Sequence, residues 1–135
     1  MVTLLADANI QGHVDRLAER MQAEPWVGFW NYLHLSYVAF ADVGLDLADS
    51  DVVVWKRCQE KGLCLVTNNR NDDGLDSLEN TIRTYNTPQS LPVFTIGDAD
   101  RTLLDRDYSD KVIWALVDYL LRLDNLLGTG RLFIP

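Results

Sequence analysis

The chain has 135 residues, of which 47% are hydrophobic, and this length and composition predict one globular domain with an ordinary apolar core. Its net charge of −8 argues against a protein that binds nucleic acid by charge alone, because neutralising phosphates requires Lys and Arg. The excess of acids leaves three interpretations: a hydrophilic surface, carboxylates that coordinate cations, or a surface that meets a basic protein partner.

The start of the chain and its apolar runs indicate where the protein works. Met1 is followed at once by an apolar run that ends at Asp7, without the basic leader that opens a secretory signal. The apolar runs all fall short of the roughly 18 residues that a membrane-spanning helix requires. Cys58 and Cys64 fit no metal-binding spacing, so we expect both to be free and buried. The sequence therefore predicts a cytoplasmic protein that does not contact a membrane.

Short apolar runs alternate with helical patterns along the chain. The expected elements are, in order, a strand over 2–6, helices over 10–21 and 23–35, a strand over 35–40, a helix over 51–61, a strand over 63–66, a helix over 77–85, a strand over 93–97, a helix over 111–126 and a strand over 131–134. This order predicts a single α/β domain over residues 1–135, with three layers and a mainly parallel sheet of about five strands. The last strand is expected at an edge of the sheet.

Capping residues mark several of the expected helix ends. They are Asn9 before the first helix, Asp49 or Ser50 before the helix over 51–61, Gly62 after it, and Ser109 or Asp110 before the last helix. Asp51 then lies in the first turn of its helix, where the helix dipole favours a carboxylate.

Aromatic side chains are concentrated in segment 23–34. Pro25 suits the first turn of a helix, and Trp26, Phe29 and Trp30 follow at helical spacing. Packing against the sheet is one interpretation of this aromatic face. An exposed surface for a dimer or another partner is the other.

Polar side chains follow the apolar runs where the predicted strands end. They are Asp7 after the first strand, Asp51 at the start of its helix, Asn69, Asn71, Asp72 and Asp73 after the strand over 63–66, and Asp98 and Asp100 after the strand over 93–97. The carboxyl ends of parallel strands meet at one edge of a sheet, so we expect these groups to converge there. Crowded carboxylates repel one another unless a hard cation such as Mg²⁺ or Mn²⁺ binds between them. The pattern thus predicts metal-dependent hydrolysis of a phosphodiester.

Other chemistries lack the residues that they require. The sequence contains no Gly-rich phosphate loop and no nucleophile elbow. His13 and His34 have no Cys or carboxylate partners at the spacing of a zinc site. A phosphoacceptor of the receiver type needs a Lys late in the fold, and Lys111 lies at a helix start instead. The remaining alternative is structural, because Asp is common in loops and helix caps.

Five short motifs occur in a fixed order along the chain. They are Leu4-Leu5-Ala6-Asp7-Ala8-Asn9, Asp42-Val43-Gly44-Leu45, Ser50-Asp51, Leu63-Cys64-Leu65-Val66-Thr67 and Gly130-Arg131-Leu132. In this order they resemble the short bacterial PIN-like domains, with an insertion at the aromatic segment and a longer loop around 74–110. The chain departs from the family pattern at Ala8, Asn69 and Asn71, where the family carries acids.

The resemblance implies a Mg²⁺- or Mn²⁺-dependent ribonuclease, often the toxin of a toxin–antitoxin pair. An amide oxygen can coordinate a hard cation but brings no charge, so the loss of acids at 69 and 71 bears directly on catalysis. The resemblance implies that Asp7 and Asp51 are metal ligands, and a small shift of the loop would let Asp72 or Asp73 replace the lost acids, with Asp98 or Asp100 as a further source of a carboxylate. An active nuclease is then expected to use Asp7, Asp51 and Asp72 as catalytic residues, Asp7, Asp51, Asp72 and Asp73 as metal ligands, and Asn9, Asn69 and Arg70 to bind the substrate.

Three hypotheses follow. The first is an active nuclease that cleaves RNA. The second is a PIN-like module that has lost catalysis and acts through a protein partner, motivated by Asn69, Asn71, Ala8 and the net charge of −8. The third is a homodimer whose aromatic face is structural and whose activity is unrelated to nucleic acid, and dimerisation is compatible with either of the other two.

Overall fold

The computed structural model describes residues 1–70, 74, 75 and 77–135, and at its centre lies a parallel sheet. Its strands are β1 (Val2–Ala6), β2 (Leu35–Val38), β3 (Leu63–Thr67), β4 (Val93–Thr95) and β5 (Arg131–Phe133). They are arranged in the order β2-β1-β3-β4-β5, and every neighbouring pair is parallel. The predicted α/β fold is confirmed, and β5 lies at an edge as expected.

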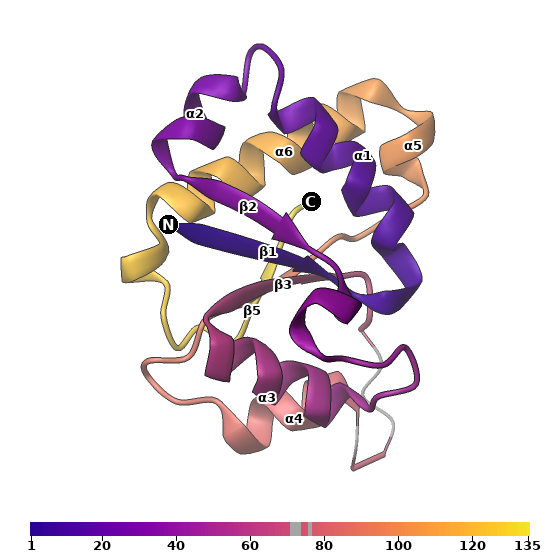
Figure 1. Ribbon diagram of the computed structural model, residues 1–135, viewed down its shortest axis with the longest axis vertical. Coiled ribbons are helices and arrows are strands. Elements are labelled where there is room, and N and C mark those ends of the chain that lie inside the picture. The colour runs from indigo at the N-terminus through magenta and orange to yellow at the C-terminus, as the bar shows by residue number, and fades with distance from the viewer. Residues whose placement is uncertain (71–73, 76) are drawn as a thin grey trace.

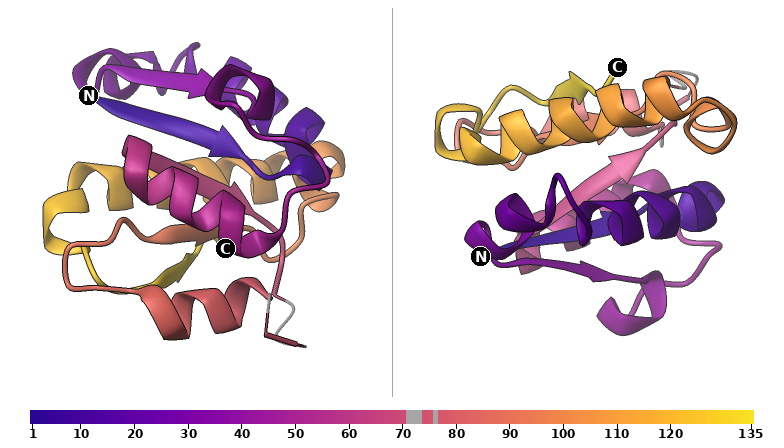
Figure 2. Two further views of the ribbon diagram at one scale, coloured as in Figure 1. Left: turned by 60° about the horizontal axis from the view of Figure 1, so that its bottom comes forward. Right: turned by 90° about the horizontal axis from the view of Figure 1, so that it is seen from above.

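Helices cover both faces of the sheet, which gives the three predicted layers. They are α1 (Gln11–Met21), α2 (Val27–Tyr32), α3 (Asp51–Lys61), α4 (Leu78–Tyr85), α5 (Arg101–Leu104) and α6 (Arg106–Leu121). Figures 1 and 2 show α1, α2, α5 and α6 on one side of the strands and α3 with α4 on the other. Each face of the sheet is therefore buried, as parallel sheets require.

The alternation of side chains along the strands divides the core into two parts. Leu4 packs with the residues beneath α1 and α6, whereas its neighbour Leu5 packs with those beneath α3 and α4. Both side chains are 1% exposed or less. The strands that carry the candidate site thus have fixed positions between two packed layers.

Local caps explain why some predicted boundaries are confirmed and others are wrong. Ser50 caps α3 by accepting the N–H of Val53, and Gly62 ends that helix with φ +69°, both as predicted. Asn9 does not cap α1. Instead, Asp7 caps a short 3-10 helix (Ala8–Ile10) that leads into α1, and its carboxylate accepts the N–H of Ala8.

The aromatic segment forms a shorter helix than the spacing predicts. The chain turns over residues 23–26, so Pro25 precedes α2 rather than opening it. The side chain of Trp26 is 4% exposed and packs on Trp114 of α6, with ring centroids 5.7 Å apart. Packing therefore explains Trp26, while Tyr32 at 74% exposure faces solvent.

The acidic stretch after β4 was expected to be a loop, and it contains a helix. α5 occupies part of it, and α6 begins at Arg106, five residues earlier than predicted. Asp105 caps α6 by accepting the N–H of Tyr108, so neither Ser109 nor Asp110 is the cap. The hydroxyl of Tyr108 donates to the carbonyl of Pro135, and this contact with the chain end fixes the first turn of α6.

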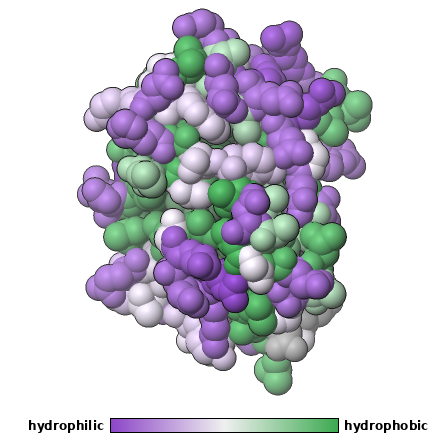
Figure 3. Space-filling view, viewed as in Figure 1, coloured by the Kyte–Doolittle hydropathy of each residue, from purple (hydrophilic) through white to green (hydrophobic). Residues whose placement is uncertain are grey.

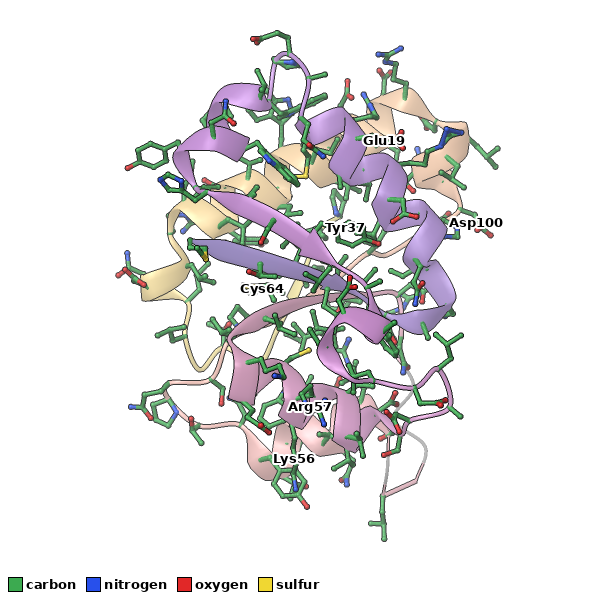
Figure 4. The ribbon with its side chains drawn as sticks, in the orientation of Figure 1. Glu19, Tyr37, Lys56, Arg57, Cys64 and Asp100 are labelled. Carbon is green, nitrogen blue, oxygen red and sulfur yellow. The ribbon has the colours of Figure 1, made fainter. Side chains whose placement is uncertain are left out.

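Both cysteines are free and buried, as predicted. Figure 4 shows Cys64 within the sheet, and burial raises the pKa of both thiols to about 12. Among the helices of the described residues, none is both long and apolar enough to cross a bilayer. On the face shown in Figure 3, hydrophilic residues cover most of the α1 side and hydrophobic residues form several separate areas.

Candidate functional site

The candidate site lies at the carboxyl edge of the sheet, where β1 and β3 end side by side. Ala6 at the end of β1 is level with Val66 of β3, and the N–H of Asp7 donates to the Val66 carbonyl at 2.8 Å. From β1 the chain leads to β2 on one side, whereas β3 and β4 lie on the other. Open α/β sheets bind ligands where the strand order diverges in this way.

Asp7 is held at this edge by two neutral donors. Its Oδ1 accepts the N–H of Ala8 at 2.8 Å, and its Oδ2 accepts the hydroxyl of Thr67 at 2.6 Å. The Thr67 hydroxyl also accepts the N–H of Asn69 at 2.9 Å, which ties the loop after β3 to the end of β1. Both donors to Asp7 are uncharged, so its negative charge is oriented without being cancelled.

Asp51 opens α3 and faces the same edge. The side-chain amide of Asn69 donates to its Oδ2 at 3.1 Å, and the N–H of Leu78 at the start of α4 also donates to this carboxylate. Burial raises the pKa of Asp51, and the charge of Asp7 raises it further. The hydrogen bond from Asn69, that from Leu78 and the charge of Arg131 act in the opposite direction. Asp7 and Asp51 are thus close enough to repel each other.

The amides of the predicted substrate-binding set lie on the rim of the site. Asn9 donates to the side-chain oxygen of Asn68 at 2.9 Å, which links the turns after β1 and β3. Arg70 is exposed at the end of the same loop. The predicted residues Asn71, Asp72 and Asp73 lie outside the described residues.

Arg131 belongs to the Gly130-Arg131-Leu132 motif, but the sequence pattern assigned it no role in the site. It begins β5, and its side chain is only 9% exposed. One nitrogen, Nη1, donates to the carbonyl of Asn69 at 2.8 Å and to the hydroxyl of Thr95 at 2.7 Å, while Nε donates to Glu79 at 3.0 Å. The sequence offered one indication of this role: Arg131 stands between a glycine and an apolar run, and a charge buried in such a strand requires a partner. Arg131 therefore holds the loop that carries Asn69.

Asp98 and Asp100 have structural partners elsewhere at this edge. The carboxylate of Asp98 accepts the N–H of Arg101 at 3.2 Å, which stabilises the start of α5. That of Asp100 lies 2.8 Å from Nε2 of His13 on α1, and Figure 4 shows Asp100 beside that helix. The structure therefore corrects the expectation that all these acids converge: it brings Asp7 and Asp51 together and gives Asp98 and Asp100 other contacts.

Comparison with protein-family models, with curated proteins and with solved structures gave no match.

The donor set at this edge consists of oxygen and amide groups. Over the described ranges, no group of three or more His, Cys, Asp or Glu side chains is arranged to hold a metal ion. The pair Asp7 and Asp51 nevertheless suits a hard cation, because carboxylate oxygens are its preferred ligands and each member receives neutral donors. The side chain of Asn69 lies against Asp51 and provides an amide oxygen as well.

Proposed function

We propose that this protein is a PIN-like, divalent-cation-dependent hydrolase of RNA phosphodiesters, with Mg²⁺ or Mn²⁺ held by Asp7 and Asp51. The observation that carries the proposal is the chain of hydrogen bonds through Thr67 and Asn69 that links these two carboxylates at the β1–β3 edge. Both are oriented by neutral donors, which is the arrangement expected where a cation completes the charge balance.

The positions of the PIN-like motifs support this proposal. Asp7 follows β1, Asp51 opens α3, Thr67 ends β3 and Arg131 begins β5. Although these residues are far apart in the sequence, hydrogen bonds link them: Asn69 bonds to Asp51, Thr67 and Arg131, and Thr67 bonds to Asp7. Four of the five motifs that carry the resemblance therefore contribute a residue to one small region.

The residues of the chain have distinct roles in this proposal. Asp7 and Asp51 would hold the cation, which when bound lowers the pKa of water and stabilises charge on phosphate oxygens. Thr67 orients Asp7, and Arg131 positions the backbone of Asn69. Asn9 and Asn69 supply amides that orient water or phosphate. Asp72, with Asp73 as its neighbour, stays the predicted third carboxylate.

Cleavage of a labelled single-stranded RNA in Mg²⁺, Mn²⁺ or EDTA tests the proposal. We expect cleavage with either metal and none in EDTA. Asp7→Asn should lower the rate about 100-fold or more, because a lost metal ligand removes several kcal/mol of charge stabilisation. Asp124→Asn is the matched control, because it removes the same charge at the opposite end of the sheet beside Met1. Absence of cleavage by the folded protein with both metals would refute the proposal.

The second candidate is a PIN-like binding module that acts through a protein partner or as a homodimer. One observation that favours it is the amide of Asn69, which donates to Asp51 where an acid would repel it and so stabilises the carboxylate without a metal. Another is an aromatic surface formed by α2 and α6: Tyr32 is 74% exposed, Trp114 45% and Leu121 43%. Phe29 joins these residues, since its ring packs edge-on against Trp114.

Light scattering and thermal melting separate the two candidates. A binding module should show no stabilisation by Mn²⁺, and a homodimer should have twice the monomer mass. Tyr32→Asp places a charge on the aromatic surface and should then yield monomers. A wild-type protein that is monomeric and is stabilised by Mn²⁺ would exclude this candidate in its dimeric form.

A further inference from the structure

A second polar feature, between α4, β5 and Arg70, is linked to the carboxylate pair through Asn69. It is a hollow of about 480 Å³, and its lining includes Arg70, Arg83, Arg131 and Phe133. We call it the arginine pocket. Arg131 and Phe133 are two residues apart on β5, so both side chains point to the side of the sheet that α4 covers.

The charge of the arginine pocket is opposite to that of the molecule. The whole chain has 12 basic and 20 acidic side chains, yet the described lining contains three arginines against one acid, Glu79. Within the described part of the chain, neither Arg70 nor Arg83 forms an ion pair, and both are exposed. A positive concavity of this kind attracts an anion even on an acidic protein.

Arg131 makes the arginine pocket more than a surface cluster. Its Nη2 lies 3.0 Å from the Glu79 carboxylate but outside hydrogen-bond geometry, so this buried nitrogen has no hydrogen-bond partner among the described residues. This nitrogen has almost no exposed surface and is ion-paired with Glu79, so Arg131 forms the fixed, positively charged wall of the pocket, while Arg70 and Arg83 are the exposed arginines that an anion can contact. Phosphate oxygens are the acceptors that match the guanidinium group best.

Geometry connects the arginine pocket to the carboxylate pair through one residue. Arg131 Nη1 holds the carbonyl of Asn69 at 2.8 Å, and the side chain of Asn69 contacts Asp51 at 3.1 Å. The same residue thus contacts both the wall of the arginine pocket and the carboxylate pair. Phe133 is 49% exposed at the rim, where an aromatic ring can stack on a base.

We propose that the arginine pocket binds a backbone phosphate of a single nucleic-acid strand, with a base of that strand stacked on Phe133. RNA is the source that the proposed function requires, and in this respect the inference rests on that function. The recognised chemistry, a phosphodiester beside an unpaired base, is common to RNA and DNA strands. The pocket thus places the strand so that a neighbouring phosphodiester lies at Asp7 and Asp51.

The test measures binding without any divalent metal, so that it is independent of cleavage. A fluorescently labelled RNA of about ten nucleotides and a DNA of the same sequence are titrated in EDTA at several salt concentrations. Arg83→Ala should weaken binding of every sequence and reduce the slope of log affinity against log salt by about 0.7, the value for one phosphate contact on a single strand. Phe133→Ala should weaken binding about tenfold, as expected for loss of one stacked base.

The control and the choice of variants keep the proposal falsifiable. Arg106→Ala removes an exposed arginine from another hollow, on the α1–α6 layer, and should leave binding nearly unchanged. Arg131→Ala is avoided because it leaves Glu79 without its ion-pair partner and can unfold the domain. Arg83 and Phe133 are exposed, so their substitution leaves the fold intact.

The possible results separate this inference from the proposed function. Equal losses of affinity in Arg83→Ala and Arg106→Ala, or no binding by the wild type, would overturn the proposal that the pocket binds a strand. Binding that depends on Arg83, without any metal-dependent cleavage, would support strand binding by the pocket and refute the proposed nuclease activity. Tighter binding of RNA than DNA would identify RNA as the source, and equal binding would identify the phosphate alone as the recognised group; both results support the pocket.

Discussion

Asp7 and Asp51 differ from Asp98 and Asp100 in the groups that contact their carboxylates, although all four residues follow strands or open helices near the carboxyl edge of one sheet. Asp100 contacts His13 at 2.8 Å, and Asp98 accepts the first free N–H of α5. Asp7 and Asp51 receive only neutral donors from the described residues, and their charges repel each other. Position at a strand end therefore does not distinguish these two pairs of acids, but the balance of charge around each pair does.

Metal binding should give the largest difference between the two pairs of aspartates. With Mn²⁺ at about 100 times its dissociation constant, the wild type should gain about 2.7 kcal/mol of stability, which is several degrees in Tm. Asp51→Asn should abolish this shift because it removes one of the two charges that hold the ion. Asp100→Asn should retain it. Melting curves with and without Mn²⁺ measure the effect, and equal loss in both variants would show that the two pairs are not distinct.

Asn69 offers a way to sharpen the same comparison. Asn69→Asp places a third carboxylate next to Asp51, with no new cation to balance it. We expect a lower Tm without metal, because like charges repel, and about tenfold tighter Mn²⁺ binding, because a charged ligand replaces a neutral one. Calorimetric titration of Mn²⁺ and melting in EDTA measure the two effects. Unchanged Mn²⁺ affinity would place the ion away from Asn69.

The sequence predicts the fold well where the signal is local. Ser50, Asp51 and Gly62 lie within one helix and its caps, and each has the predicted role. The predicted start of α6 was wrong because Asp105, Ser109 and Asp110 are all suitable N-cap residues. The first turn at Asp105 is fixed by the hydrogen bond from the Tyr108 hydroxyl to Pro135, 27 residues away. The spacing of residues within a helix does not reveal a contact between residues so far apart in the sequence.

The sequence predicted where the candidate site lies, but it did not predict which residues contact one another there. The strand pattern placed Asp7 and Asp51 at one edge, and in the structure hydrogen bonds through Thr67 and Asn69 link them. Their partners come from far along the chain: Thr67 is 60 residues from Asp7, and Arg131 is 62 residues from Asn69. Which acids have such partners depends on side-chain reach across the sheet, so the structural role of Asp100, 87 residues from His13, could not be predicted.

The pH dependence of stability should have opposite signs at Asp51 and at Asp105. Burial first, and then Asp7, raises the pKa of Asp51 above its ordinary 3.8, so the folded state favours the protonated acid. Its contribution to stability is present below pH 3.8 and is lost as the pH rises through the raised pKa. The hydrogen bond from the N–H of Tyr108 lowers the pKa of Asp105, so its contribution is present above pH 3.8 and is lost as the pH falls through the lowered pKa.

Two substitutions check these signs in EDTA. Asp51→Asn should raise Tm at pH 7 by less than the metal-induced shift and leave it unchanged at pH 3, where the wild-type acid is protonated. Asp105→Ala should lower Tm at pH 7, and the difference from wild type should narrow towards pH 2. Melting curves from pH 2 to 7 measure both. A fall in Tm for Asp51→Asn at pH 7 would show that its hydrogen bonds outweigh its burial and its repulsion by Asp7.

The contact between His13 and Asp100 should have the smallest effect. Asp100 is 86% exposed, and solvent screens its attraction to the imidazole, so exposed pairs of this kind contribute at most about 1 kcal/mol. His13→Ala should therefore shift Tm by a few degrees or less, and high salt should reduce the shift further. Cleavage and Mn²⁺ binding should stay at wild-type levels, because the contact joins α1 to the turn before α5 and leaves the bonds of Asp7 and Asp51 intact. A large loss of Mn²⁺ affinity in His13→Ala would mean that Asp100, once released, competes for the ion, and the two pairs of aspartates would then form one site.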